Sequence, residues 1–178
     1  MGRNARTRPM RIRFAMLQPG DRAPPFELPD ADLEVVALEQ FIGRCAVVLY
    51  FYPKDDTPGC TIEAVEFSER LDEFQQAGAT VLGVSRDDVD SHGCFRDRHG
   101  LAVRLLSDVD LDAARAYGVT QEKPVATLDG VVRTRTAVQR SSFLIDRTGI
   151  VRIAMYGVGA RGHAADMLDR VRQLLQLR

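Results

Sequence analysis

The sequence predicts an α/β domain in which helices flank a central mixed sheet. At 178 residues, the chain has the length of one domain. Its composition, 45% hydrophobic and 28% charged, is that of an ordinary globular protein with its own core. Short apolar runs alternate with segments of helical periodicity, which indicates strands joined through helices.

The most strongly predicted strand is the apolar run Cys45–Tyr52, which is rich in β-branched and aromatic residues. Such a run is typical of a central strand buried on both faces. From Thr61 the apolar residues repeat at helical spacing as far as a capping Gly78, which predicts an amphipathic helix.

The later elements continue the alternation and end in a hairpin followed by a helix. The predicted order is β-α-β-α-β-α-β-β-α, and the final hairpin makes the sheet mixed. These elements are expected at residues 80–85, 89–99, 105–107, 108–117, 142–146, 150–156 and, for the last helix, 164–175.

Charge is distributed unevenly along the chain. Residues 1–17 hold five arginines and no acidic residue, whereas the other 19 basic side chains stand against 25 acidic ones. An acidic body matches a phosphate backbone poorly, so we expect no nucleic-acid partner. Without a signal-type apolar region or a run long enough to span a bilayer, no membrane association is expected. For residues 1–16 we predict a disordered extension, with a weak targeting segment as the alternative, and for 17–178 one domain.

The three cysteines, Cys45, Cys60 and Cys94, are an odd number in a chain large enough to build a core. This does not fit a secreted disulfide framework and favours a reducing compartment, so a cytoplasmic location is expected. Cys45 lies in the apolar strand and is expected to pack in the core.

Cys60 occupies a position suited to nucleophilic chemistry. Thr57 is a good N-cap and Pro58 suits the first helical position, which places Cys60 third in the helix. Unpaired N–H groups and the helix dipole favour an anion there, so the thiol is expected to ionise readily.

Neighbouring residues offer support for such a nucleophile. The Thr57 hydroxyl can bond either the thiolate or a bound oxygen atom, and Gly59 allows a reactant close to the backbone. Arg140 stands beside the strand predicted at 142–146 and is expected to reach Cys60 and stabilise negative charge.

The spacing Pro53-x-x-x-Thr57-x-x-Cys60 resembles the signature of peroxiredoxins, and the surrounding sequence is similar to their bacterioferritin-comigratory, or Q-type, branch. The similarity extends over residues 17–176. Further matching segments are Pro19-Gly-Asp-x-Ala-Pro24, Gly83-Val-Ser-Arg-Asp87, Leu105-Leu-Ser-Asp108, Tyr117-Gly-Val119 and Arg140-Ser-Ser-Phe-Leu-Ile-Asp146.

The resemblance implies a thioredoxin-like fold and an antioxidant thiol peroxidase acting in cell redox homeostasis. Such an enzyme reduces hydrogen peroxide and organic hydroperoxides through a sulfenic acid, which would form on Cys60. Pro53, Thr57, Gly59 and Arg140 would complete the catalytic site. The resemblance implies neither a metal nor an organic cofactor, because the sulfur takes both electrons.

The recycling step is left open by the sequence. Many Q-type members carry a resolving cysteine five residues after the first, where this chain has Val65, and a second subset carries it on the third helix. That subset has a Ser-His-x-x-Phe-Cys segment, whereas this chain has Ser91-His-Gly-Cys94-Phe95, so its cysteine comes one residue early. One residue turns a helix by about 100°. Either Cys94 resolves Cys60 after the helix unwinds, or an external thiol does so. The resemblance implies thioredoxin or a similar thiol as reductant, and a monomer or weak homodimer.

Two other uses of Cys60 differ in how well they fit. A redox sensor that oxidises Cys60 without sustained turnover needs the same chemistry and stays an alternative. A disulfide oxidoreductase normally needs a Cys-x-x-Cys pair. The positions three residues before and after Cys60 are Thr57 and Glu63, so Cys60 has no such partner.

Three further motifs are better explained by structure than by ligands. The glycines of 157–162 have dinucleotide-loop spacing, but no second strand follows, so a loop covering the end of the sheet is expected. The acidic run 108–112 lacks the later ligands of a calcium loop and is expected to cap a helix. His92, Cys94 and His99 share one short helix, which predicts a solvated helix face rather than a zinc site.

Overall fold

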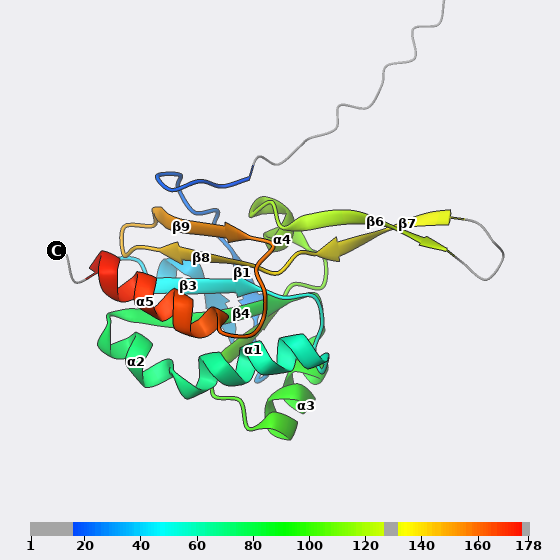
Figure 1. Cartoon of the computed structure of the whole chain (residues 1–178), viewed down its shortest axis with the longest axis horizontal. Helices are drawn as coiled ribbons and strands as arrows, with labels where there is room; N and C mark the ends of the chain where they lie inside the picture. The colour runs from blue at the N-terminus through cyan, green and yellow to red at the C-terminus, as the bar shows by residue number, and fades with distance from the viewer. Residues whose placement is uncertain (1–15, 127–131, 176–178) are drawn as a thin grey trace, which may run out of the picture.

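The computed structural model describes residues 16–126 and 132–175, and its centre is a five-stranded mixed sheet (Figure 1). β3 (Ala46–Phe51) pairs in parallel with β4 (Ala79–Ser85) on one side. On its other side β3 pairs antiparallel with β8 (Ser141–Ile145). β5 (Arg104–Ser107) extends the parallel side and β9 (Val151–Tyr156) the antiparallel side. The predicted α/β class and mixed sheet are confirmed, and the fold is thioredoxin-like.

The predicted burial of β3 on both faces is also confirmed. All six of its residues are buried, and alternate side chains enter two separate apolar clusters. Val48 and Tyr50 pack in one cluster, whereas Val47 and Leu49 pack in the other. This alternation follows from the two-residue period of a strand.

Four helices cover one face of the sheet (Figure 1). They are α1 (Pro58–Glu69), α2 (Leu71–Gln76), α3 (Val89–His99) and α5 (His163–Leu175). The other face is covered by the short α4 (Asp112–Ala116), the hairpin of β1 (Glu27–Pro29) and β2 (Val35–Ala37), and the 3₁₀ turn η1 (Leu38–Gln40).

Two predicted helices differ from those in the structure. The helix expected from Thr61 to Gly78 begins earlier, at Pro58, and is interrupted at Arg70, which has a non-helical ψ of 6°. The apolar spacing survives because α1 and α2 present Phe67 and Phe74 to the same cluster. The helix expected over 108–117 forms only in its second half.

The most prominent unpredicted element is the hairpin of β6 (Thr120–Ala126) and β7 (Val132–Val138). It projects beyond the end of the central sheet (Figure 1). Residues 121–126 and 132–135 are exposed, so most of the hairpin packs on neither cluster.

The predicted basic extension, apart from Met16, lies outside the described residues. Within the described part of the chain, no helix is both long and apolar enough to cross a bilayer.

Candidate active site

Cys60 lies where the sequence predicts it, at the third position of α1 beyond the end of β3. Its side chain is almost completely buried. Thr57 occupies the N-cap position with extended backbone, and Pro58 begins the helix. The loop after β3 and the first turn of α1 therefore place the thiol at the positive end of a helix.

Arg140 directly precedes β8 and reaches Cys60 from the neighbouring strand. Its Nη2 lies 3.2 Å from Cys60 Sγ, within hydrogen-bond distance for sulfur. Burial alone would lower the pKa of Arg140, but the charges of Glu63 and Cys60 hold it above its ordinary value. The guanidinium stays charged and is aimed at the sulfur.

Glu63 is the member of this site that the sequence interpretation missed. Its side chain is completely buried, and its Oε2 accepts a hydrogen bond from Arg140 Nη1. Burial raises the pKa of Glu63 to about 8, against the opposing charge of Arg140. Glu63 and Cys60 are three residues apart on α1 and therefore share a face. That spacing was the available signal, but it means little until Arg140 is placed between them.

Gly59 has a structural role beside the predicted one, and its catalytic role stays a prediction. A Cβ at Gly59 would lie 3.3 Å from Arg140 Nη2 and 3.6 Å from the Cβ of Ala160. The bare backbone therefore makes room for the guanidinium that contacts Cys60.

Thr57 and Pro53 do not make the contacts that the simplest interpretation expects. The Thr57 hydroxyl caps no helix N–H and instead donates to the carbonyl oxygen of Lys54 at 3.0 Å. Pro53 is exposed at the start of the loop. Both belong to the loop that delivers Cys60, and their catalytic roles stay predictions.

The glycine-spaced loop 157–162 forms a wall of the site, as predicted for a loop that covers the end of the sheet. Val158 N–H donates to the carbonyl oxygen of Arg140 at 3.0 Å. Gly162 N–H donates to Glu66 Oε2 at 2.8 Å, which ties the loop to α1. The loop thus contacts the backbone of Arg140 and places Ala160 beside Gly59.

The other two cysteines do not lie beside Cys60. Cys94 is exposed on α3, so its predicted resolving role requires the helix to move. Cys45 precedes the first residue of β3 and is half-buried, which corrects the prediction of core packing. A six-residue strand spans about 20 Å, so Cys45 lies near the opposite end of the sheet from Cys60.

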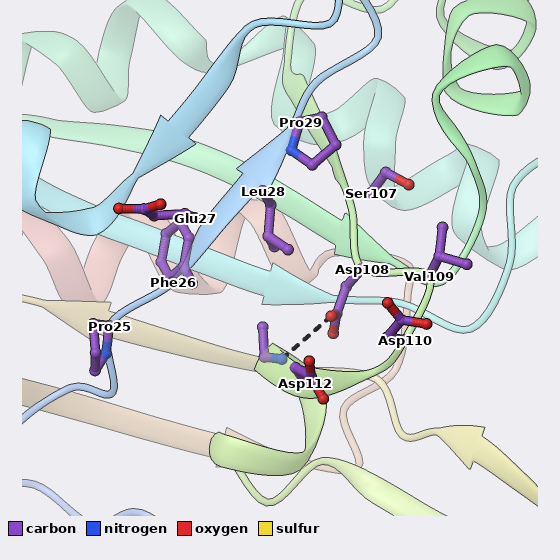
Figure 2. Close-up of a pocket in the computed structure, with 11 residues that line it drawn as sticks. Pro25, Phe26, Glu27, Leu28, Pro29, Ser107, Asp108, Val109, Asp110 and Asp112 are labelled. Atoms are coloured by element: carbon purple, nitrogen blue, oxygen red, sulfur yellow. Dashed lines mark hydrogen bonds between the residues drawn. The ribbon is translucent and has the colours of Figure 1, made fainter.

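Of the two remaining motifs, the acidic run caps a helix as predicted, whereas His92 does not lie on a solvated face. Figure 2 shows the acidic run beside a recess formed with β1, and Asp108 accepts hydrogen bonds from Ala113 and Ala114 N–H, as predicted for a cap. The solvated face expected for His92 is wrong, because its side chain is completely buried. Among the described residues no group of three or more His, Cys, Asp or Glu could hold a metal ion.

A thioredoxin-like fold that presents a buried cysteine at a helix start against an arginine defines the class of thiol peroxidases. The chain belongs to the AhpC/TSA family, which it matches over residues 19–154, and it is a peroxiredoxin of the bacterioferritin-comigratory, or Q-type, branch.

Similar proteins cover most of the chain. Peroxiredoxin Bcp of Escherichia coli K12 is 41% identical over 75% of this chain and 81% of its own length. Peroxiredoxin Bcp of Bacillus subtilis is 35% identical over 87% and 95%, respectively. The solved bacterioferritin comigratory protein of Xanthomonas campestris is 37% identical, with a TM-score of 0.76 over 84% of this chain and 92% of that one.

Proposed function

We propose that this peroxiredoxin reduces hydrogen peroxide and alkyl hydroperoxides at Cys60 and is recycled by thioredoxin or a similar thiol. The observation that carries the proposal is the 3.2 Å contact between Arg140 Nη2 and Cys60 Sγ. The Xanthomonas campestris relative is described for its alkyl peroxide reduction activity, which supports this substrate class.

The first half-reaction transfers one oxygen atom to sulfur. The Cys60 thiolate attacks the terminal peroxide oxygen, the O–O bond breaks, and the sulfenic acid forms while the other oxygen leaves as alkoxide or hydroxide. The leaving oxygen takes the proton that the thiol gave up. Arg140 is placed to stabilise charge on both the sulfur and the leaving oxygen.

The second half-reaction returns the sulfur to its thiol. A second thiol attacks the sulfenic acid, forming a disulfide and releasing water, and thiol–disulfide exchange with the reductant restores Cys60. A mass shift alone does not distinguish an enzyme from a redox sensor, since both oxidise Cys60. Sustained consumption of hydroperoxide with a dithiol reductant separates them.

The test is single-turnover peroxide consumption combined with dimedone trapping and peptide mapping. Cys60→Ser is expected to abolish consumption, and Arg140→Lys to slow it by about 10²-fold or more, because lysine cannot reproduce the guanidinium geometry. Cys45→Ser is the matched control and should react like the wild type, because that thiol lies near the other end of β3. Full turnover by Cys60→Ser would contradict the proposal.

A further inference from the structure

A buried polar cluster joins the loop that precedes Cys60 to α3. Asp55, five residues before Cys60, has 4% of its side chain exposed, and His92 on α3 has none. His92 Nδ1 lies 2.8 Å from Asp55 Oδ2, and His92 Nε2 lies 3.1 Å from the carbonyl oxygen of Leu106 on β5. Neither residue contacts Cys60 or Arg140 through any of these bonds.

Both ring nitrogens of His92 have a hydrogen-bond partner. The Leu106 carbonyl can only accept, so Nε2 carries a hydrogen. Asp55 accepts from Tyr52 Oη at 2.7 Å and from Ser91 Oγ at 2.8 Å, which is the pattern of an ionised carboxylate. Burial alone would raise the pKa of Asp55, but its hydrogen bonds and the charge of His92 hold that pKa below its ordinary value. The contact between His92 Nδ1 and Asp55 Oδ2 is therefore a buried hydrogen bond to a carboxylate.

This pair restrains both elements that must meet in a two-cysteine cycle. Asp55 lies in the loop that presents Thr57, and its own N–H donates to Asp87 Oδ2 at 2.9 Å, which ties the loop to the turn before α3. His92 and Cys94 are two residues apart, which is about 200° around a helix. The face that buries His92 therefore holds Cys94 toward solvent, where the structure places it.

We propose that His92 and Asp55 are positioning residues whose buried hydrogen bond orders the loop before Cys60 and holds α3 folded, and that the pair separates when Cys94 turns inward to resolve Cys60. This inference rests on the proposed function. In the resolving step the Cys94 thiolate attacks the Cys60 sulfenic acid, the S–S bond forms, the S–O bond breaks, and the leaving hydroxide takes up a proton as water.

A second contact between the same loop and α3 supplies a matched control. Asp56 pairs with Arg98 and His99 near the C-terminus of α3, but these side chains are partly exposed. Asp56 has a φ of 57°, a conformation that asparagine tolerates well. Asp56→Asn therefore breaks an exposed contact with little strain, whereas Asp55→Asn breaks the buried one.

The experiment measures hydrogen exchange over α3 and the fate of Cys60 after one equivalent of hydrogen peroxide. Asp55→Asn and His92→Asn are expected to speed exchange in residues 89–99 by about tenfold or more relative to the wild type, without a matching change in β3. The rate of peroxide consumption should fall in both variants, while Cys60–Cys94 disulfide formation from the sulfenic acid should rise by a similar factor. If Asp55 and His92 had a merely structural role, the substitutions would slow both peroxide consumption and Cys60–Cys94 disulfide formation. Asp56→Asn should behave like the wild type.

Three results would overturn the inference. They are unchanged exchange in α3, an equal increase across α3 and β3, and the absence of a Cys60–Cys94 disulfide in wild type and variants alike. Failure of the proposed function can be distinguished from failure of this inference. In that case the wild type would consume no peroxide and Cys60 would yield no dimedone adduct.

Discussion

His163 allows a quantitative prediction about acid stability. It begins α5 directly behind the active-site wall, with Nε2 2.6 Å from Ser142 Oγ and the ring edge-on to Phe67 at a centroid distance of 5.7 Å. Burial lowers the pKa of His163 to about 4, and the nearby charge of Arg140 acts in the same direction. The native protein therefore holds this imidazole neutral across the physiological range.

The sign and size of the effect follow from linkage. The unfolded chain protonates His163 near its ordinary pKa of 6.5, whereas the native state resists protonation until about pH 4. Stability contributed by neutral His163 is therefore complete above pH 6.5 and is lost as the pH falls toward 4. The loss amounts to about 3 kcal/mol at 1.36 kcal/mol per pH unit.

The assay compares urea unfolding of the wild type and His163→Gln at pH 7, 5.5 and 4. Glutamine keeps a polar partner for Ser142 but does not titrate. Acidification should cost the wild type about 3 kcal/mol more than the variant, because all other titrating groups are shared. Parallel losses in the two proteins would refute the reasoning.

Three more predictions concern α1 and its partners. Because the pKa of Glu63 is raised to about 8, the free energy of unfolding of the wild type should fall as the pH rises from about 4.5 to 8, which is the opposite of the His163 effect. Glu63→Gln should remove this fall, and urea unfolding of both proteins over that pH range tests it. Gly59→Ala should slow single-turnover peroxide consumption by about tenfold with little change in Tm, because the added Cβ crowds Arg140 Nη2 at 3.3 Å; an unchanged rate would show that the guanidinium has room to shift. Phe67→Ala should lower the free energy of unfolding by about 3–5 kcal/mol in urea titrations, because the ring is fully buried and stacks on Tyr50; a loss below 1 kcal/mol would mean that the cluster collapses into the space.

The central sheet and the placement of Cys60 follow from local sequence because β3 is apolar throughout and the capping residues of α1 are adjacent. The prediction that Arg140 reaches Cys60 also agrees with the structure. Glu63 escaped prediction because a carboxyl three residues from a cysteine becomes meaningful only when a distant arginine lies between them. His92 was misassigned for the same reason, since its partners Asp55 and Leu106 come from other elements.

The remaining misassignments concern boundaries and exposure. Cys45 belongs to the apolar run by sequence, but β3 begins one residue later and leaves this thiol at the sheet end. The hairpin of β6 and β7 gives no alternating signal, because solvent surrounds most of it and Pro124 sits inside β6. A strand that buries neither face has no apolar pattern to detect.

That same hairpin bears on how copies of the chain behave toward one another. A two-stranded ribbon leaves backbone groups free along its outer edges, where a strand from another molecule can add. Pro124 removes one donor from such an edge, and the register places Lys123 directly opposite Arg135, so like charges are concentrated there. Two approaching hairpins would repel each other electrostatically. At 0.1 M salt this repulsion is screened beyond about 10 Å. Edge-to-edge pairing of two hairpins should therefore be least favourable in dilute salt, where this repulsion is least screened.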